Sequence, residues 1–410
     1  MPVINELSPL TNYFLEKEEM YGAHNYHPLP VVLTRGKGVF VWDVDDNRYY
    51  DFLSGYSAIN QGHCHPRIIE TFIEQAQRLT LTSRAFHNDV LGEYEEFITR
   101  FFGYDKVLPM NTGVEGVETA LKLARRWGYE VKGVDKNKAK IITCANNFHG
   151  RTISVISYST DDSSKRDFGP FTPGFDVIPY NDIPALKLAL EDSNVVGFLV
   201  EPIQGEAGVI VPDEGYLAAA AKVCKDANVL FMADEIQTGL ARTGRMLACD
   251  HENVRPDILI LGKALSGGTM PVSAVLADNC IMDTIKPGEH GSTYGGNPLA
   301  CKVAMTSLQV LVDEQMAENS LELGKYFRQG LRAIGHEHIS VVRGKGLFNA
   351  IVIDHPDKDA AWAICLEMKK NGLIAKPTHG DRIRFAPPLL ITREQTEECV
   401  EIIRKSMLLF

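Results

Sequence analysis

The chain contains 410 residues, enough for about two or three domains at roughly 150 residues each. Its composition, 45% hydrophobic and 23% charged, is that of a globular protein and excludes a disordered or low-complexity chain. Lys+Arg 42 against Asp+Glu 53 leaves a net charge of -11, which argues against a general binder of nucleic acid or anionic membranes. No apolar run approaches the roughly 18 residues that a membrane span needs.

The predicted elements begin with a short β unit at residues 31–52, which contains a turn-like Asp-Asp-Asn sequence. Residues 115–128 predict an amphipathic helix, because their apolar side chains recur at i, i+3, i+4 and i+7. A long helical stretch follows residue 300, and two β-rich segments, 340–353 and 373–386, come after it. These last elements predict a smaller α+β domain that shares its sheet with the N-terminus.

Short, continuous apolar runs alternate with helical patterns through the middle of the chain. Continuous runs are typical of strands buried on both faces of a mostly parallel sheet. The sequence therefore predicts an α/β fold, divided into an N-terminal segment (1–50), a large domain (51–298) and a small C-terminal domain (299–410). The runs are Lys140–Cys144, Val195–Val200, Val229–Ala233 and Ile258–Leu261.

The eight cysteines are scattered, without a C-x-x-C pair, and this favours reduced thiols in the cytosol. The first 20 residues contain four Glu and no Arg, whereas a transit peptide is Arg-rich and poor in acids. A secretory signal would have an apolar core, which is also missing there. We therefore expect a cytoplasmic protein.

Lys263 and Asp234 each follow a predicted buried strand, where ligands bind in open α/β sheets. Desolvation would lower the pKa of such a lysine from about 10.4, and a partly neutral amine can form a Schiff base with an aldehyde. An ionised Asp can keep the ring nitrogen of pyridoxal phosphate (PLP) protonated, and Gln237 can donate to the ring's phenolic oxygen. Taken singly, Lys263 is more simply interpreted as a solvated loop lysine, and Asp234 as a helix cap or a surface acid.

Two segments are candidate phosphate sites. Residues 110–115 lead into the predicted helix with small and polar side chains, so backbone N–H groups and the helix dipole would face an anion. Residues 291–298 form a Gly-rich loop with two hydroxyl groups. An ordinary capping turn is the alternative for the first.

A metal site is an alternative from another functional class. His63 and His65 have an H-x-H spacing, as in some zinc sites. Supporting ligands are poor, however, and a structural turn is the simpler interpretation.

Together these motifs resemble the class III subgroup of fold-type I PLP-dependent aminotransferases, and within it the ornithine aminotransferases. The similar stretches cover nearly the whole chain. ADEIQTG (233–239) and LGKALSGG (261–268) are specific to the class. Three others are more specific to the ornithine enzymes: YGAHNY (21–26), NQGHCHP (60–66) and GEHGSTYGGNP (288–298).

The resemblance implies a role for each cofactor-site residue. Lys263 would bind PLP covalently and then act as general base, and Asp234 would pair with the pyridinium. The other cofactor contacts would come from Phe148 and Ile236 on the two ring faces, Gln237 at the phenolic oxygen, Gly113 and Val114 at the phosphate, and Ser292 and Thr293 reaching the neighbouring subunit of a homodimer. His149 stands where some relatives carry Trp, and it is assigned no catalytic role.

The resemblance also implies the substrates, L-ornithine and 2-oxoglutarate, in arginine and proline metabolism. Two carboxylates call for two cationic partners, and Arg151 and Arg384 are the candidates because guanidinium binds carboxylate bidentately. Glu206 would mask Arg384 while ornithine is bound. Tyr26 would hydrogen-bond the α-amino group of ornithine, and Tyr56 would line the pocket. The alternatives are an acetylornithine or 4-aminobutyrate aminotransferase, a zinc hydrolase, or a catalytically silent binding protein with the same fold.

Overall fold

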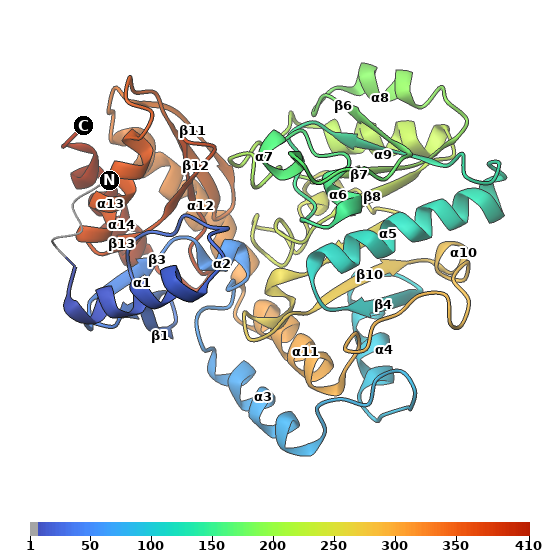
Figure 1. The fold of residues 1–410 in the computed structure, drawn as a ribbon, viewed down its shortest axis with the longest axis horizontal. Helices are drawn as coiled ribbons and strands as arrows, with labels where there is room; N and C mark the ends of the chain where they lie inside the picture. Colours follow the sequence, from blue (N-terminus) through green and yellow to red (C-terminus); the bar gives the residue numbers. More distant parts are fainter. Residues whose placement is uncertain (1–6) are drawn as a thin grey trace.

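The computed structural model describes residues 7–410, which form three sheets and the helices that cover them (Figure 1). The largest sheet has seven strands in the order β4-β10-β9-β8-β7-β5-β6, and β10 runs antiparallel to both of its neighbours. The remaining pairs are parallel. Its strands are β4 (Lys106–Met110), β5 (Lys140–Cys144), β6 (Phe175–Ile178), β7 (Val195–Val200), β8 (Leu230–Asp234), β9 (Ile258–Leu261) and β10 (Ser273–Ala277).

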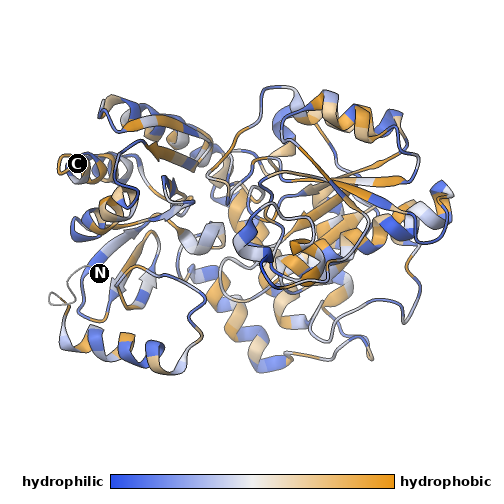
Figure 2. Cartoon of the chain, turned by 45° about the horizontal axis from the view of Figure 1, so that its top comes forward, coloured by the Kyte–Doolittle hydropathy of each residue, from blue (hydrophilic) through white to orange (hydrophobic). Residues whose placement is uncertain are grey.

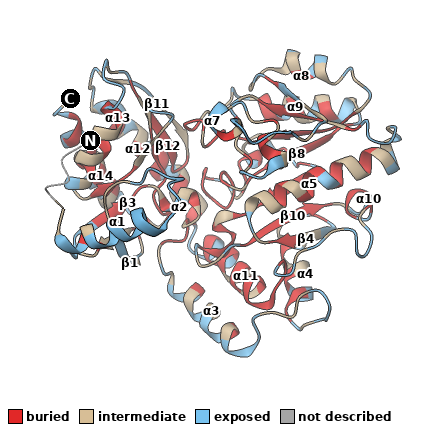
Figure 3. Ribbon diagram, in the orientation of Figure 1, coloured by how far each residue is buried: buried red, intermediate tan, exposed pale blue. Residues whose placement is uncertain are grey.

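Every residue of β7, β8, β9 and β10 is buried, as the continuous apolar runs predict. Figure 2 shows the same strands as predominantly hydrophobic, and Figure 3 shows them as the buried centre of the larger half of the molecule. Helix α5 (Gly113–Trp127) covers one face of the sheet, and α8 (Ile183–Ala189) and α9 (Tyr216–Asp226) cover the other. The four strands predicted from apolar runs and the α/β class are thereby confirmed.

The two ends of the chain lie side by side, on the left in Figure 1. The first four-stranded sheet joins β1 (Leu33–Lys37), β2 (Phe40–Asp43) and β3 (Arg48–Asp51) to β13 (Leu373–Ile374), and β13 pairs with β3 in parallel. This confirms the predicted sharing of a sheet between the two ends. The second sheet consists of β11 (Ile339–Lys345), β12 (Phe348–Ile353), β15 (Arg382–Phe385) and β14 (Lys376–Thr378). Helices α1 (Pro9–Tyr21), α12 (Met316–Ala333), α13 (Ala360–Lys370) and α14 (Arg393–Met407) accompany these sheets.

The remaining helices link the two halves or lie beside the large sheet. The longer ones are α3 (Pro66–Arg78), α4 (Leu91–Phe102) and α11 (Pro298–Asp313), and α11 packs on both of the others. The single-turn helices are α2 (Ser54–Ser57), η2 (Gly128–Lys132), α6 (Ile153–Ile156), α7 (Asp162–Lys165), η3 (Cys249–Glu252), η4 (Lys263–Ser266) and α10 (Asn279–Met282). In residues 7–410, no helix combines the length and the apolarity that crossing a membrane requires. The proposed domain limits stay a prediction, and residues 1–6 of the N-terminal segment lie outside the described chain.

The buried Arg242 links the large half to the C-terminal part of the chain. Its guanidinium donates to the carbonyls of Leu347 and Pro387, at 3.0 and 2.6 Å, and to the side-chain oxygen of Asn60 at 2.6 Å. The residue is fully buried, so each of these hydrogen bonds replaces water that the guanidinium has lost. Arg242 is therefore a fixed polar link between the large half and the C-terminal part of the chain.

Glu235, directly after β8, is a buried carboxyl without a cationic partner among its hydrogen bonds in the described chain. It accepts from the backbone N–H of Cys249 at 2.8 Å and from the hydroxyl of Thr238, and burial raises its pKa to about 7. A raised pKa in the folded state means that stability is lost as the pH rises from about 4.5 to 7, because the unfolded chain ionises this acid in that range while the folded protein keeps it protonated.

We therefore expect Glu235→Gln to gain stability relative to the wild type as the pH rises. The stability difference between the variant and the wild type should grow by on the order of 2 kcal/mol from pH 5.5 to pH 8, or about 2–4 °C in Tm. Thermal unfolding at both pH values measures it. Glu322→Gln, on the exposed face of α12, is the matched control, and it should show the same Tm difference at both pH values. A pH-independent Tm difference for Glu235→Gln would contradict the prediction.

Candidate active site

Lys263 begins η4, two residues after the end of β9, so it lies at the carboxyl edge of the large sheet. Its backbone has a φ of 45°, in the left-handed region that a non-glycine residue adopts only at a cost of about 1–2 kcal/mol. Burial lowers the pKa of its ammonium group, although the carboxylates of Glu206 and Asp234 oppose the shift. The strained backbone and the desolvated amine together favour a reactive lysine over the alternative of a solvated loop residue.

Asp234 is the last residue of β8, the parallel neighbour of β9, and it is paired with Ile260. Its carboxylate is buried and accepts a hydrogen bond of 2.6 Å from Nδ1 of His149, which follows β5. Burial acts to lower the pKa of His149, but the hydrogen bond and charge of Asp234 outweigh it and raise that pKa. Asp234 is therefore a buried, oriented anion and not a surface acid or a simple helix cap.

Helix α5 begins two residues earlier than predicted, because Thr112 caps it. The hydroxyl of Thr112 accepts from the backbone N–H of Glu115, and the Glu115 carboxylate accepts from the N–H of Thr112 at 2.7 Å. At Gly113 a β-carbon would lie 3.0 Å from the side chain of Ile236, so glycine permits this close approach. The hydroxyl of Ser292 accepts from Asn111 at 2.7 Å, which brings the second candidate phosphate loop to the first.

A cavity of about 240 Å³ opens between these elements. Most of the predicted cofactor residues line it together, although they come from four separate segments of the chain. Its walls are Gly113, Val114, Phe148, His149, Gly150, Glu201, Glu206, Asp234, Ile236, Gln237, Thr238 and Lys263.

At one side of the cavity, Glu206 and Arg384 form a shielded ion pair. Arg384 Nη1 donates to Glu206 Oε1 at 2.8 Å, and Gln237 donates to the same oxygen at 3.2 Å. Burial acts to raise the pKa of Glu206, but the guanidinium of Arg384 holds it below its usual range. The Arg384 guanidinium lies 5.1 Å from the ring centre of Tyr56, and its Nε is buried without a partner among the described residues. Arg384 thus keeps unused donor capacity next to a carboxylate that neutralises it.

Tyr56 reaches this network from an unusual backbone. Residues 54–57 all have positive φ, and for Tyr56 the value is 59°. Burial raises the pKa of its phenol, and the neighbouring Glu206 adds to the shift. Strain of this kind persists where the surrounding structure fixes it, and it concentrates at functional sites.

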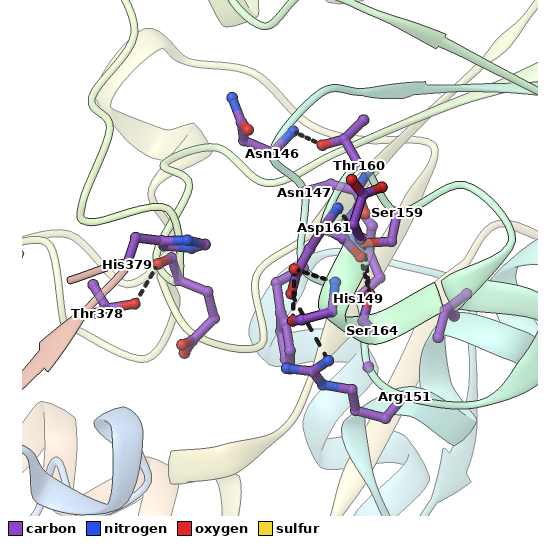
Figure 4. A pocket seen from close by; sticks show the side chains of 16 residues that line it. Asn146, Asn147, His149, Arg151, Ser159, Thr160, Asp161, Ser164, Thr378 and His379 are labelled. Atoms are coloured by element: carbon purple, nitrogen blue, oxygen red, sulfur yellow. Dashed lines mark hydrogen bonds and ion pairs between the residues drawn. The ribbon is translucent and has the colours of Figure 1, made fainter. Parts of the chain in front are cut away.

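A second cavity of about 450 Å³ adjoins the first and shares Phe148, His149, Gly150 and Glu206 with it. Figure 4 shows Arg151 and Asp161 on one side of this cavity and Thr378 and His379 on the other. The Arg151 guanidinium lies 5.4 Å from the ring centre of Phe148, and 60% of its side chain is exposed. The described site therefore contains two guanidinium groups, that of Arg384 at the inner cavity and that of Arg151 in the outer cavity.

Comparison with known proteins agrees with this geometry. The sequence profile of the family "Aminotransferase class-III" matches residues 21–407. The chain belongs to the class III aminotransferases.

The chain is similar over nearly its whole length to individual aminotransferases. The chain is 62% identical to the mitochondrial ornithine aminotransferase of Rattus norvegicus, over 98% of this chain and 92% of the rat protein. The solved ornithine aminotransferase of Toxoplasma gondii, described with partial PLP occupancy at its active site, has a TM-score of 0.95 and 51% identity over 97% and 94% of the two chains. The acetylornithine aminotransferase of Elizabethkingia anophelis has a TM-score of 0.90 and 59% identity over 98% and 99%.

Class III aminotransferases use PLP, and the residues of the inner cavity fit it. A desolvated lysine amine, a buried carboxylate and a capped helix start beside a glycine suit the aldehyde, the pyridine nitrogen and the phosphate of PLP. When bound, PLP supplies an electron sink for a substrate carbanion. Lys263, Asp234, Gly113 and Val114 would hold it, with Phe148 and Ile236 on its two sides.

The structure does not bring every predicted residue of this class III enzyme into the two cavities. Tyr26 is 72% exposed, although it is near enough to raise the pKa of Tyr56. Thr293 is exposed, so its predicted reach to a neighbouring subunit stays a prediction. The amide of Gln237 contacts Glu206 and Arg384, and its predicted contact with the PLP phenolic oxygen likewise stays a prediction.

The zinc alternative finds no support. His63 Nε2 lies 2.8 Å from Asp51, while His65 Nε2 lies 2.9 Å from Glu314. The two rings therefore contact different carboxylates and do not share one site. Within the described chain, no group of three or more His, Cys, Asp or Glu side chains is arranged to hold a metal ion.

Two residues of the site went unassigned in the sequence analysis. His149 received no role, yet its ring orients the carboxylate of Asp234. Glu201 is buried and accepts from the backbone N–H groups of Phe148 at 2.9 Å and Gly205 at 3.2 Å, so it connects the predicted ring-stacking residue to the loop that carries Glu206. Burial raises the pKa of Glu201 to about 7. The only sequence signal for Glu201 is its position at the end of a predicted buried strand.

Proposed function

We propose that this class III aminotransferase is an ornithine δ-aminotransferase. L-ornithine gives its δ-amino group to PLP and leaves as glutamate 5-semialdehyde, which cyclises to 1-pyrroline-5-carboxylate. 2-Oxoglutarate then accepts the amino group and leaves as glutamate. The observation that carries this proposal is the Glu206–Arg384 pair at 2.8 Å beside the Lys263 amine, with the guanidinium of Arg151 exposed in the outer cavity.

The pair explains why the terminal amine of the donor reacts. An unmasked arginine near the reacting carbon would attract the α-carboxylate of an amino acid, and the α-amino group would then be presented to Lys263. With Arg384 neutralised by Glu206, the remaining accessible guanidinium in the two cavities is that of Arg151. A donor held there by its α-carboxylate presents its far end to Lys263, and ornithine carries an amine at that end.

The same residues accommodate the acceptor when the pair opens. 2-Oxoglutarate has two carboxylates, and Arg384 and Arg151 provide two guanidinium partners once Glu206 turns away. The Glu206 side chain is linked to Arg384 and Gln237 by two hydrogen bonds, so these are the contacts that its rotation would break. With the substrate amine in its place on the cofactor, the Lys263 amine would be free to hold or move a proton at the reacting carbon of the substrate.

The similarity to the Elizabethkingia anophelis enzyme makes acetylornithine aminotransferase the second candidate. N-acetylornithine has the same δ-amine and the same carboxylate as ornithine, so the Glu206–Arg384 pair serves both donors equally. The two functions differ only at the α-nitrogen. 4-Aminobutyrate, which lacks an α-nitrogen and is one carbon shorter, would also leave Arg384 masked.

The deciding experiment mixes the purified PLP-bound protein with ornithine, N-acetylornithine or 4-aminobutyrate alone. With ornithine, the visible band of the bound cofactor should disappear and 1-pyrroline-5-carboxylate should form. Steady-state turnover with 2-oxoglutarate should give parallel lines in double-reciprocal plots, since one cofactor carries the amine between two half-reactions. Faster conversion of N-acetylornithine would replace the proposal with the second candidate.

Glu206→Gln should separate the two half-reactions. The amide removes the charge that neutralises Arg384, so kcat/KM for ornithine should fall about 10- to 100-fold, the range for a charged hydrogen bond of about 1.5–3 kcal/mol. The glutamate half-reaction, which needs Arg384 unmasked, should stay within threefold or accelerate. Single-turnover rates for the two donors measure this, and an equal loss in both would contradict the masking role.

We also propose that the protein acts as a homodimer whose sites contain residues of both subunits. Support comes from two neighbouring loops with large exposed apolar side chains: Phe86 is 73% exposed and Tyr294 59% exposed. A β-carbon on Gly296 would lie 3.5 Å from Arg84, so the loops adjoin each other. The molar mass in solution, against the 45.5 kDa of one chain, tests the assembly.

The proposed compartment is the cytoplasm. Support comes from the eight cysteines, which are all free, and six of them are buried. The rat and Drosophila relatives are named as mitochondrial proteins, so the mitochondrion is the alternative compartment. Fractionation of the native cells, followed with an antibody to this chain, distinguishes the two compartments.

A further inference from the structure

We propose that Asp161 binds the α-ammonium group of the donor, so that Arg151 and Asp161 together recognise the zwitterionic α-amino acid end of the donor in the outer cavity. This inference rests on the proposed function, because it concerns the end of the donor that does not react. It assigns a specificity-determining contact to a residue that the sequence analysis did not single out.

Hydrogen bonds to one oxygen hold the carboxylate of Asp161 in place, and its other oxygen is available to a ligand. Oδ1 accepts from the backbone N–H of Ser163 at 3.0 Å and from its hydroxyl at 2.7 Å. Oδ2 lies 4.0 Å from Nη1 of Arg151 and makes no hydrogen bond with any residue of the described chain. The backbone of Asp161 is itself fixed, since its N–H donates to the hydroxyl of Ser159 at 3.1 Å.

The spacing of these two charges matches an α-amino acid. The ammonium and carboxylate of such a molecule are joined through a single carbon, so they need an anion and a cation that are close together but not in tight contact. At 4.0 Å, Arg151 and Asp161 satisfy that condition, and both face the outer cavity (Figure 4). Burial acts to raise the pKa of Asp161, but the hydrogen bonds from Ser163 and the charge of Arg151 hold it below its usual range, so the group is ionised at neutral pH.

The arrangement distinguishes the candidate ligands by charge. Ornithine offers an ammonium to Asp161, whereas N-acetylornithine offers a neutral amide. 2-Oxoglutarate brings a carboxylate to Arg151 and nothing for Asp161, so it meets repulsion there. The ammonium has three N–H donors, and therefore the predicted hydrogen bond to Tyr26 is compatible with a contact to Asp161.

The test compares Asp161→Asn with the wild type in the PLP-bound protein. The matched donor is 5-aminopentanoate, which is ornithine without its α-amino group. We expect kcat/KM for ornithine to fall about 5- to 10-fold, as for one charged hydrogen bond at a partly exposed site. The value for 5-aminopentanoate, or its inhibition constant against ornithine, should stay within twofold, and KM for 2-oxoglutarate should fall or stay unchanged. Asp167→Asn, an exposed residue outside the outer cavity with the same change of charge, should leave all three unchanged.

Each outcome separates this inference from the function on which it rests. Equal losses for ornithine and 5-aminopentanoate in Asp161→Asn would show a structural effect and overturn the contact, while wild-type turnover of ornithine would still support the function. Unchanged kinetics for ornithine would overturn the contact in the same way. If the wild type does not convert ornithine at all, the function itself fails.

Discussion

Lys263→Ala should abolish transamination, with turnover of ornithine falling by about 10⁴-fold or more. A general base positioned next to the reacting carbon contributes about 10²–10⁴ on its own. The same amine is also the attachment point for PLP, so the variant loses two contributions at once. Both contributions depend on an uncharged amine, because only an uncharged amine attacks an aldehyde or accepts a proton. Burial favours that form by lowering the pKa of the Lys263 ammonium.

Two measurements check this expectation independently of turnover. Reduction with borohydride should add the mass of the cofactor to the wild-type chain and leave Lys263→Ala unmodified, and the visible band of the variant should be that of free PLP. Lys263→Arg is the control, because it keeps the positive charge beside Glu206 and Asp234 but cannot form the bond. Turnover above about 1% of wild type in either variant would contradict the assignment of Lys263.

The central sheet could be predicted from the sequence because its signal is local. A strand buried on both faces needs apolar side chains at every position, so runs such as Ile258–Leu261 are visible without knowledge of their neighbours. Helix α5 was predicted to begin at residue 115 and begins at Gly113, because the side-chain hydrogen bonds of Thr112 and Glu115, and not hydrophobic periodicity, decide its first turn. Strand order depends on pairing between distant segments and did not follow from the runs.

Part of the site could likewise be predicted from local sequence, and part of it could not. The positions of Lys263 and Asp234 at strand ends follow from the residues themselves, and the structure places both at one edge of the sheet. The Glu206–Arg384 pair joins residues 178 positions apart, and only resemblance to a family suggested it. The contact of His149 with Asp234 spans 85 positions and was not foreseen, since a histidine next to an aromatic residue gives no local indication of its partner.

Asp234→Asn should lower turnover about 10²- to 10³-fold and leave the fold intact. The amide keeps the shape of the carboxylate but not its charge, and a preorganised charge at a reacting group contributes about 2.7–4 kcal/mol. His149 adds a second effect. Its pKa is raised by the charge of Asp234 against the opposing effect of burial, so the variant should leave the His149 ring neutral.

The control for Asp234→Asn is chemical. A PLP analogue whose ring nitrogen is methylated carries a permanent positive charge and does not need Asp234 to keep it. Reconstituted with this analogue, Asp234→Asn should recover most of the lost turnover relative to its activity with PLP, whereas Lys263→Ala should recover none. Activity is measured with saturating ornithine and 2-oxoglutarate. If the analogue restores nothing to Asp234→Asn, the carboxylate acts by holding His149 and the cavity wall and not by keeping a proton on the ring nitrogen, and the 2.6 Å hydrogen bond then becomes the contact to vary.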